Sequence, residues 1–365
     1  MAGNPHPVLA MDEKFRGYLP PRNWTLCVGA GVSKGIAPEW SELAYEVVAE
    51  TFRSGISRNE FNQLCTESGW TLDSWIQAAA NRHTSAGKSA ASFRDLIESK
   101  LYSKIRNVAR GMGIDRELTR VLNLPKSAPK DRVIEVCELI ENEFQHSSLV
   151  QIGNALIRSA RVGKGPAAIL TFNADTFLET YIDLKLRTEH YLGPGPHSHP
   201  KYYFVQLTRP TSMQGDKTPI IHCHGSVAPE YSVGKRPRDS RDRLVFLEQE
   251  YIAMSHAGAA WGQITFLHFA QSSRLVFVGM SMSDSNVRRW MSAAESERGM
   301  DRHIFSYASR PNPDHIWVRP QPKNSDAAEI TLYSLHHLGI RPAWIPDWKY
   351  LGAGIENMAA VPAGA

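Results

Sequence analysis

Four short groups of small, polar or titratable residues directly follow apolar runs in this sequence of 365 residues. They span residues 29–33, 173–175, 222–225 and 279–284. Glycine allows a backbone to approach a phosphate closely, amides and carboxylates bind sugar hydroxyls or a water, and histidine accepts a proton near neutral pH. In open parallel sheets, ligands bind at the carboxyl ends of the strands. If the four apolar runs are neighbouring strands, the four groups form one active site.

The first group has the composition of a phosphate-binding loop but fits neither common nucleotide motif. Gly29, Ala30 and Gly31 follow "WTLCV" and precede Ser33. The dinucleotide motif of dehydrogenases requires a third glycine and a second strand that ends in an acid about 20 residues later, and helical sequence follows here instead. The Walker motif requires lysine directly before serine or threonine, whereas here Ser33 precedes Lys34. Taken alone, the loop is explained equally well by an ordinary tight turn.

The second and fourth groups also have ordinary structural interpretations. Asn173 and Asp175 fit an Asx turn that starts the next helix, or an amide and a carboxylate that bind a sugar hydroxyl or a water. Gly279, Ser281 and Asp284 precede the helical segment "NVRRWMSAA" and fit a helix cap. Because caps and ligand contacts use the same backbone amides, the fourth group is compatible with both roles.

The third group contains two histidines, His222 and His224, followed by Gly225. On a strand both histidine side chains would face the same side. No carboxylate or third histidine stands nearby in the sequence, and the four cysteines form no C-x-x-C pair, so neither a metal site nor a structural zinc is expected. His224 is the better candidate for a general base, because Gly225 gives a substrate room to approach it.

The composition is that of a globular protein, with 42% hydrophobic and 21% charged residues. The net charge of +4 does not by itself indicate nucleic-acid binding. No apolar run approaches the roughly 18 residues needed to cross a bilayer, and the N-terminus lacks the pattern of a secretory signal. We therefore expect a cytoplasmic protein with reduced cysteines and no membrane association.

The apolar patterns predict an α/β fold. Helical patterns fill residues 41–165, most clearly at 131–144 and 148–161, and that region contains no buried strand pattern. A further helix with a glycine stop is predicted at 329–340. The predicted strands lie in "WTLCVGAG" and at residues 167–175, 202–208, 218–226, 273–284, 302–308 and 341–346.

Taken together and in this order, "GAGVS", "TFNAD", "HGS" and "VGMS" resemble the motifs of the sirtuin family, whose fold is a Rossmann-like NAD-binding domain with a smaller inserted module. This chain lacks the four-cysteine zinc module of protein-deacylating sirtuins, and it has "GIAPEWSEL" where a deacylase has a Pro-Asp-Phe-Arg run. The segments "LVFLEQEYIAM" and "VFVGMSMSDSNVRRWM" are instead similar to sirtuin-like domains of bacterial antiphage defence systems. Those domains hydrolyse NAD and carry a helical insertion in place of the zinc module.

The resemblance implies a Rossmann-like parallel sheet with helices on both faces and a helical insertion that replaces the zinc module. The implied boundaries are an N-terminal lead-in at 1–22, the NAD-binding domain at 23–40 and 166–350, the insertion at 41–165, and a C-terminal tail at 351–365.

The resemblance also implies that NAD is the substrate, cleaved at the nicotinamide–ribose bond to nicotinamide and ADP-ribose, with no zinc. Asn173 would orient the ribose and the attacking water, and His224 would be the general base. His222 receives no role in this assignment. The residues implied to contact the dinucleotide are Gly29, Ala30, Gly31, Ser33, Asp175, Gly225, Gly279, Ser281 and Asp284.

The biological role implied is an NAD-depleting effector of an abortive-infection system. We expect its activation by homo-oligomerisation or by a separate partner, such as a HerA-type ATPase or a short Argonaute. Two other functions stay open, namely a sirtuin-type ADP-ribosyltransferase or deacylase, and an inactive NAD- or nucleotide-binding sensor. The basic loop at 229–243 fits either a nucleic-acid contact or a solvated surface.

Overall fold

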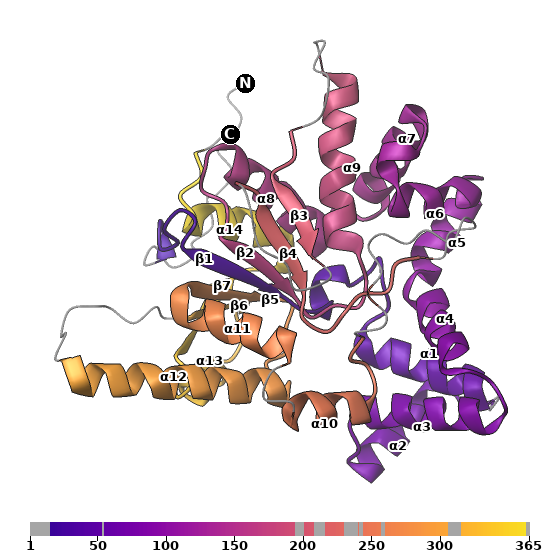
Figure 1. Ribbon diagram of the computed structural model, residues 1–365, viewed down its shortest axis with the longest axis horizontal. Coiled ribbons are helices and arrows are strands. Elements are labelled where there is room, and N and C mark those ends of the chain that lie inside the picture. Colours follow the sequence, from indigo (N-terminus) through magenta and orange to yellow (C-terminus); the bar gives the residue numbers. More distant parts are fainter. Residues whose placement is uncertain are drawn as a thin grey trace.

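The centre of the molecule is a parallel β-sheet (Figure 1). The computed structural model describes residues 15–52, 55–193, 201–207, 216–229, 240, 244–256, 260–305 and 315–362. The seven strands of this sheet run in the order β3-β4-β2-β1-β5-β6-β7, and every pairing is parallel. Their bounds are β1 (Trp24–Val28), β2 (Ala168–Thr171), β3 (Phe204–Leu207), β4 (Thr218–His222), β5 (Arg274–Val278), β6 (His315–Pro320) and β7 (Ile340–Ile345). The predicted α/β fold with a Rossmann-like sheet is confirmed.

Four neighbouring strands end at the same level of the carboxyl edge. Val28 of β1 pairs with Thr171 of β2 and with Val278 of β5. Thr171 in turn pairs with His222 of β4, and all four residues are the last of their strands. From β1 the chain continues on one side to β2 and β4, and later on the other side to β5. This reversal beside β1 is the switch point at which open α/β sheets bind ligands.

Helices cover both faces of the sheet (Figure 1). Leu26 and Val28 point into one core and Cys27 into the other, because successive side chains of a strand face opposite sides. Burial on both faces explains why the strands read as continuous apolar runs. The first face is covered by α8 (Ser148–Arg161), α9 (Phe177–Leu192) and α14 (Leu351–Met358). The second is covered by α11 (Trp261–Ser272), α12 (Ser285–Phe305) and α13 (Ser325–His336).

The elements that the structure describes between β1 and β2 are all helices, as expected. The predicted helices at 131–144 and 148–161 correspond to α7 and α8. Whereas α8 packs against α9 and α14, the other helices gather beside the carboxyl end of the strands, and α7 among them also packs against α9 (Figure 1). We call these others, α1 to α7, the helical block. They are α1 (Trp40–Phe52), α2 (Arg58–Ser68), α3 (Leu72–Ser85), α4 (Ala90–Leu101), α5 (Ser103–Gly111), α6 (Asp115–Asn123) and α7 (Lys130–Glu143).

Two expectations about the second half of the sheet were wrong. A strand was predicted at 302–308, but residues 302–305 continue helix α12, and 306–308 lie outside the described residues. The strand next to β5 is instead β6, His315–Pro320, which was not predicted. Both runs are short, and a short apolar run does not by itself distinguish a strand from a helix.

The two ends of the described chain pack together on the first face of the sheet. Residues expected to form a C-terminal tail include α14, whose Glu356 forms an ion pair with Arg158 of α8. In the expected lead-in, Leu19 is buried and its amide donates to the carbonyl of Met358 at 2.9 Å. Both segments therefore contribute to the core.

The cysteines are free, and two of them lie within the sheet region. Cys27 and Cys223 are buried in the same core, and burial raises the pKa of Cys223 to about 12. They behave as small apolar groups. In the described ranges, no helix is both long and apolar enough to cross a membrane.

Candidate active site

The loop after β1 packs tightly against the loop after β5. Residues Ala30–Ser33 form one 3-10 turn directly after Gly29. A Cβ atom on Gly29 or Gly31 would lie 2.7 or 2.8 Å from the carbonyl oxygen of Gly279, and the Gly31 amide donates to that oxygen at 2.9 Å. Contact between two loops therefore requires these glycines, whatever ligand they bind. Ala30 and Gly31 are nevertheless exposed at the edge of the sheet.

Asn173, on the loop after β2, is held at three of its four polar atoms. Its amide N–H donates to Thr171 Oγ1 at 3.1 Å, and its carbonyl oxygen accepts from His222 Nδ1 at 3.2 Å. Its side-chain Nδ2 donates to Ser33 Oγ at 3.3 Å. Asn173 Oδ1 is buried and has no hydrogen-bond partner among the described residues. This oxygen is therefore available to accept a hydrogen bond from a ligand.

Asp175 and Ser33 join the loops of β1 and β2. Ser33 Oγ donates to Asp175 Oδ1 at 3.0 Å, and the amide of Phe177 donates to the same oxygen at 3.1 Å. The second contact is the Asx turn expected before α9. Burial raises the pKa of Asp175 to about 6, against the opposing effect of both hydrogen bonds. The carboxyl group at this joint therefore titrates close to neutral pH.

His224 lies in a buried aromatic pocket after β4. The rings of Phe172 and Tyr251 lie 5.0 and 5.4 Å from its ring, edge to face. Gly225 follows with a φ of 74°, the left-handed region that favours glycine. Burial lowers the pKa of His224, and the charge of Asp284 opposes that effect. Since His224 Nε2 is buried without a partner in the described residues, a neutral imidazole can accept a proton there.

The loop between β5 and α12 carries Ser281 and Asp284. The Asp284 carboxylate accepts from the amides of Asn286 and Val287 at 2.8 and 3.1 Å, so the helix cap expected from the sequence is present. Ser281 is exposed. The charge of Asp284 also acts on His224, so the cap residue lies near the loop after β4. Asp284 therefore caps α12 and also contributes to the electrostatics of the site.

Tyr102, between α4 and α5, was not predicted to belong to the site. Its hydroxyl donates to the carbonyl oxygen of Val227 at 2.8 Å and accepts from the amide of Thr176 at 3.0 Å. The buried hydroxyl thus joins the loops after β4 and β2. Its position in the middle of the helical block gives no local sequence signal of this role.

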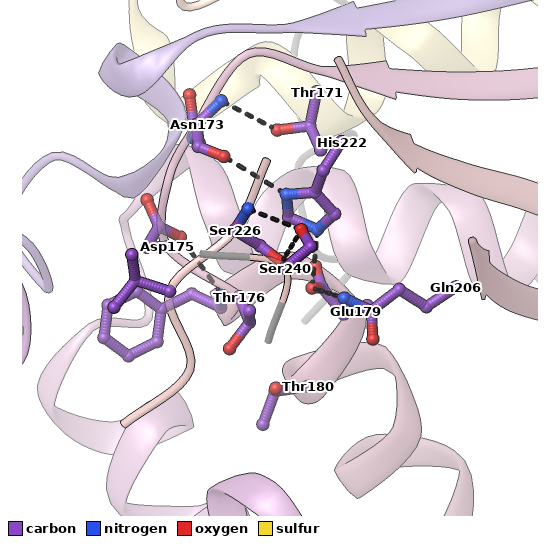
Figure 2. Close-up of polar contacts among 12 residues, drawn as sticks. Thr171, Asn173, Asp175, Thr176, Glu179, Thr180, Gln206, His222, Ser226 and Ser240 are labelled. Carbon is purple, nitrogen blue, oxygen red and sulfur yellow. Dashed lines mark hydrogen bonds and ion pairs between the residues drawn. The ribbon is translucent and has the colours of Figure 1, made fainter. Parts of the chain in front are cut away.

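Glu179 was also missed, together with its contact to His222. Figure 2 shows the His222 ring between the carbonyl of Asn173 and the carboxylate of Glu179. Glu179 lies in the first turns of α9, where its sequence position indicates only a helical residue. The structure therefore gives His222 a defined environment beside the candidate catalytic residue Asn173.

Two expectations concern residues near these loops. No group of three or more histidine, cysteine, aspartate or glutamate side chains able to hold a metal occurs within the described ranges. The basic loop predicted at 229–243 lies outside the described residues, except for Pro229 and Ser240. Ser240 Oγ accepts from the amide of Ser226 at 2.8 Å, so residue 240 lies against the loop after β4.

The structure thus brings all four predicted groups to one edge of the sheet. A family model described as SIR2-like domain matches residues 167–340. The matched range includes the loops with Asn173, His224 and Gly279 and excludes the loop after β1. A search of curated proteins found no match. The family match supports the presence of a sirtuin-like domain in this chain. Domains of this class are generally NAD-dependent enzymes.

Proposed function

We propose that the protein hydrolyses NAD+ at the nicotinamide–ribose bond and releases nicotinamide and ADP-ribose. The observation that supports this most strongly is a pair of buried polar atoms, Asn173 Oδ1 and His224 Nε2, which lack partners among the described residues. They follow the neighbouring strands β2 and β4. Buried polar atoms are rarely left unpaired in folded proteins, and a ligand with hydroxyl groups would pair both.

In the proposed reaction, the bond between C1′ of the ribose and the ring nitrogen of nicotinamide breaks, and its electron pair stays with the nitrogen. The leaving group needs no acid, because it departs as a neutral molecule. A water oxygen forms the new bond to C1′ and one proton is released. His224 Nε2 accepts that proton, directly or through a ribose hydroxyl, and Asn173 Oδ1 orients the water or the ribose.

The other predicted residues would hold the dinucleotide along the carboxyl edge. The exposed residue Ala30 at the start of the 3-10 turn suits the phosphates, although the Gly31 amide beside it is donated to Gly279, and the β5 loop with Gly279 and Ser281 suits the adenosine half. Ser33 has a different role in this proposal. Its hydroxyl is engaged by Asp175 and Asn173, so it fixes the two loops relative to each other.

We also propose that the activity depletes NAD in an antiphage response and is activated by homo-oligomerisation or by a partner such as a HerA-type ATPase or a short Argonaute. A partner that binds the helical block could affect the site, because the block contacts the loops that form it. Tyr102 contacts the loops after β2 and β4, and Asn123 Nδ2 of α6 donates to the carbonyl of Pro229 at 2.6 Å. A shift of the block would therefore move the loop that carries His224.

The test is NAD+ consumption by wild type, Asn173→Ala and His224→Ala, alone and in an extract of infected cells, with products separated by chromatography. The exposed residues Asn62 and His337 supply matched controls, Asn62→Ala and His337→Ala. We expect wild type and controls to release nicotinamide and ADP-ribose, and both site variants to lose about 100-fold or more in rate.

The other functions give different results in the same experiment. ADP-ribose attached to protein, with little free ADP-ribose, would identify a transferase. NAD+ binding measured by calorimetry, with no turnover in either setting or with added partner proteins, would identify a sensor. A site variant that keeps the wild-type rate would remove Asn173 or His224 from the mechanism.

A further inference from the structure

His222 occupies the last position of β4, beside Asn173 (Figure 2). Its side chain is fully buried, and its Nε2 lies 2.8 Å from Glu179 Oε1. Its Nδ1 lies 3.2 Å from the carbonyl oxygen of Asn173. Gln206 of β3 donates its side-chain amide to the same Glu179 oxygen at 3.0 Å. The group therefore links β3, β4, α9 and the loop after β2.

The hydrogen-bond partners constrain where protons lie on the His222 ring. A backbone carbonyl has no proton, so His222 Nδ1 must donate to Asn173. Glu179 Oε1 already accepts from Gln206, and it accepts from His222 Nε2 when it is ionised. Both ring nitrogens then carry hydrogen. With Glu179 ionised, the geometry is that of an imidazolium paired with a carboxylate inside the protein.

The electrostatic surroundings favour the same protonation state. Burial alone would lower the pKa of His222, but the charge and hydrogen bond of Glu179 raise it, aided by the Asn173 carbonyl and the charge of Asp175. The net pKa lies above the ordinary value. The pKa of His224, two residues later, is lowered instead. The surroundings therefore shift the pKa values of the two histidines in opposite directions from the ordinary value.

We propose that the charged His222–Glu179 pair is the positioning device for Asn173 in NAD+ cleavage, and this inference rests on the function proposed above. A charge-assisted bond from His222 holds the Asn173 carbonyl. Thr171 and Ser33 hold the remaining polar atoms except Oδ1, so the direction of that oxygen is fixed. A neutral His222 has one N–H and leaves one of its two acceptors unpaired.

The kinetic test compares three variants with wild type. His222→Gln removes the charge and has one donor nitrogen where the imidazolium has two, so kcat should fall about 10- to 100-fold through misplacement of Asn173. KM should stay within about twofold, because the contacts with phosphates and adenosine remain. His222→Lys restores a cation with three donors and should recover kcat to within roughly fivefold of wild type. Glu179→Gln should resemble His222→Gln.

A second measurement needs no turnover. Nitrogen-15 NMR of the wild-type histidines, with the His222 signals assigned by their loss in His222→Lys, should show two protonated ring nitrogens on His222 at pH 7. His224 should be neutral under the same conditions. The side-chain amide signal of Asn173 should shift in His222→Gln and return in His222→Lys.

These outcomes separate the two proposals. If wild type does not consume NAD+, but His222 is doubly protonated and the Asn173 amide signal responds as described, the pair positions Asn173 and the proposed function fails. A singly protonated His222 at pH 7 overturns the inference, as does His222→Gln with wild-type kcat or with equal losses in kcat and substrate affinity. A variant that does not fold by circular dichroism is replaced by Glu179→Gln, and the wild-type NMR result stands alone.

Discussion

Asp175 carries a negative charge at neutral pH at a cost to stability. Its carboxyl group is buried, and burial raises its pKa from the ordinary value of 3.8 to about 6. The folded state therefore binds the proton more tightly than the unfolded state does. As pH rises from 3.8 to about 6, stability is lost, and above that window the loss is constant. We predict that Asp175→Asn stabilises the protein at neutral pH.

The size of the effect follows from the two pKa values. Ionisation of Asp175 should cost about 3 kcal/mol at pH 7 and about 0.5 kcal/mol at pH 4. The asparagine side chain keeps a carbonyl oxygen that can accept from Ser33 and Phe177, the partners of Asp175 Oδ1. Asp175→Asn should therefore raise the free energy of unfolding by about 3 kcal/mol at pH 7 and by little at pH 4.

Urea titrations followed by circular dichroism at pH 4 and pH 7 measure this gain. Asp131→Asn is a suitable control, because the Asp131 side chain is 75% exposed and a surface charge contributes little. Equal effects of Asp175→Asn at the two pH values would refute the reasoning, since the gain must come from ionisation. The wild-type carboxylate would then be adequately stabilised by its two hydrogen bonds.

Three further predictions concern the same loops. Tyr102→Phe leaves the buried carbonyl of Val227 without its donor and should lower the free energy of unfolding by about 1–3 kcal/mol in urea. Gly279→Ala places a Cβ atom 2.6 Å from the amide nitrogen of Val32, at a position whose φ is 65°. Calorimetry should therefore show weaker NAD+ binding, and urea titration should show a free energy of unfolding lower by about 2 kcal/mol or more. Because burial lowers the pKa of His224, the acid limb of kcat/KM should have its midpoint below 6.5, and a higher midpoint would contradict its role as the base.

The sheet edge could be predicted because strand ends and chemical groups coincide in the sequence. Each of Gly29, Phe172, Cys223 and Gly279 directly follows the last residue of its strand. Parallel pairing then places the groups at one level, since the four last residues are in register. Strand assignment, together with the expectation that the strands are parallel neighbours, was enough to predict this part of the site.

The contacts that fix the site could not be predicted in the same way. Tyr102 and Thr176 are 74 residues apart, and His222 and Glu179 are 43 residues apart, so their contacts depend on how helices pack on the sheet. The glycines show a related limit. Gly29 and Gly31 were attributed to a phosphate, and the structure shows that close contact with Gly279, and for Gly29 also with Met280, by itself requires their small size.

The two histidines after β4 show most directly why a motif does not determine chemistry. His222 and His224 have the same side chain and are both buried, but the pKa of one is raised and that of the other is lowered. His222 faces the carboxylate of Glu179, whereas Phe172 and Tyr251 enclose His224. A base must be neutral before it accepts a proton, and a charged donor must stay protonated. In the proposed mechanism only the neighbours of each ring assign these opposite tasks, with His222 holding Asn173 and His224 taking the proton.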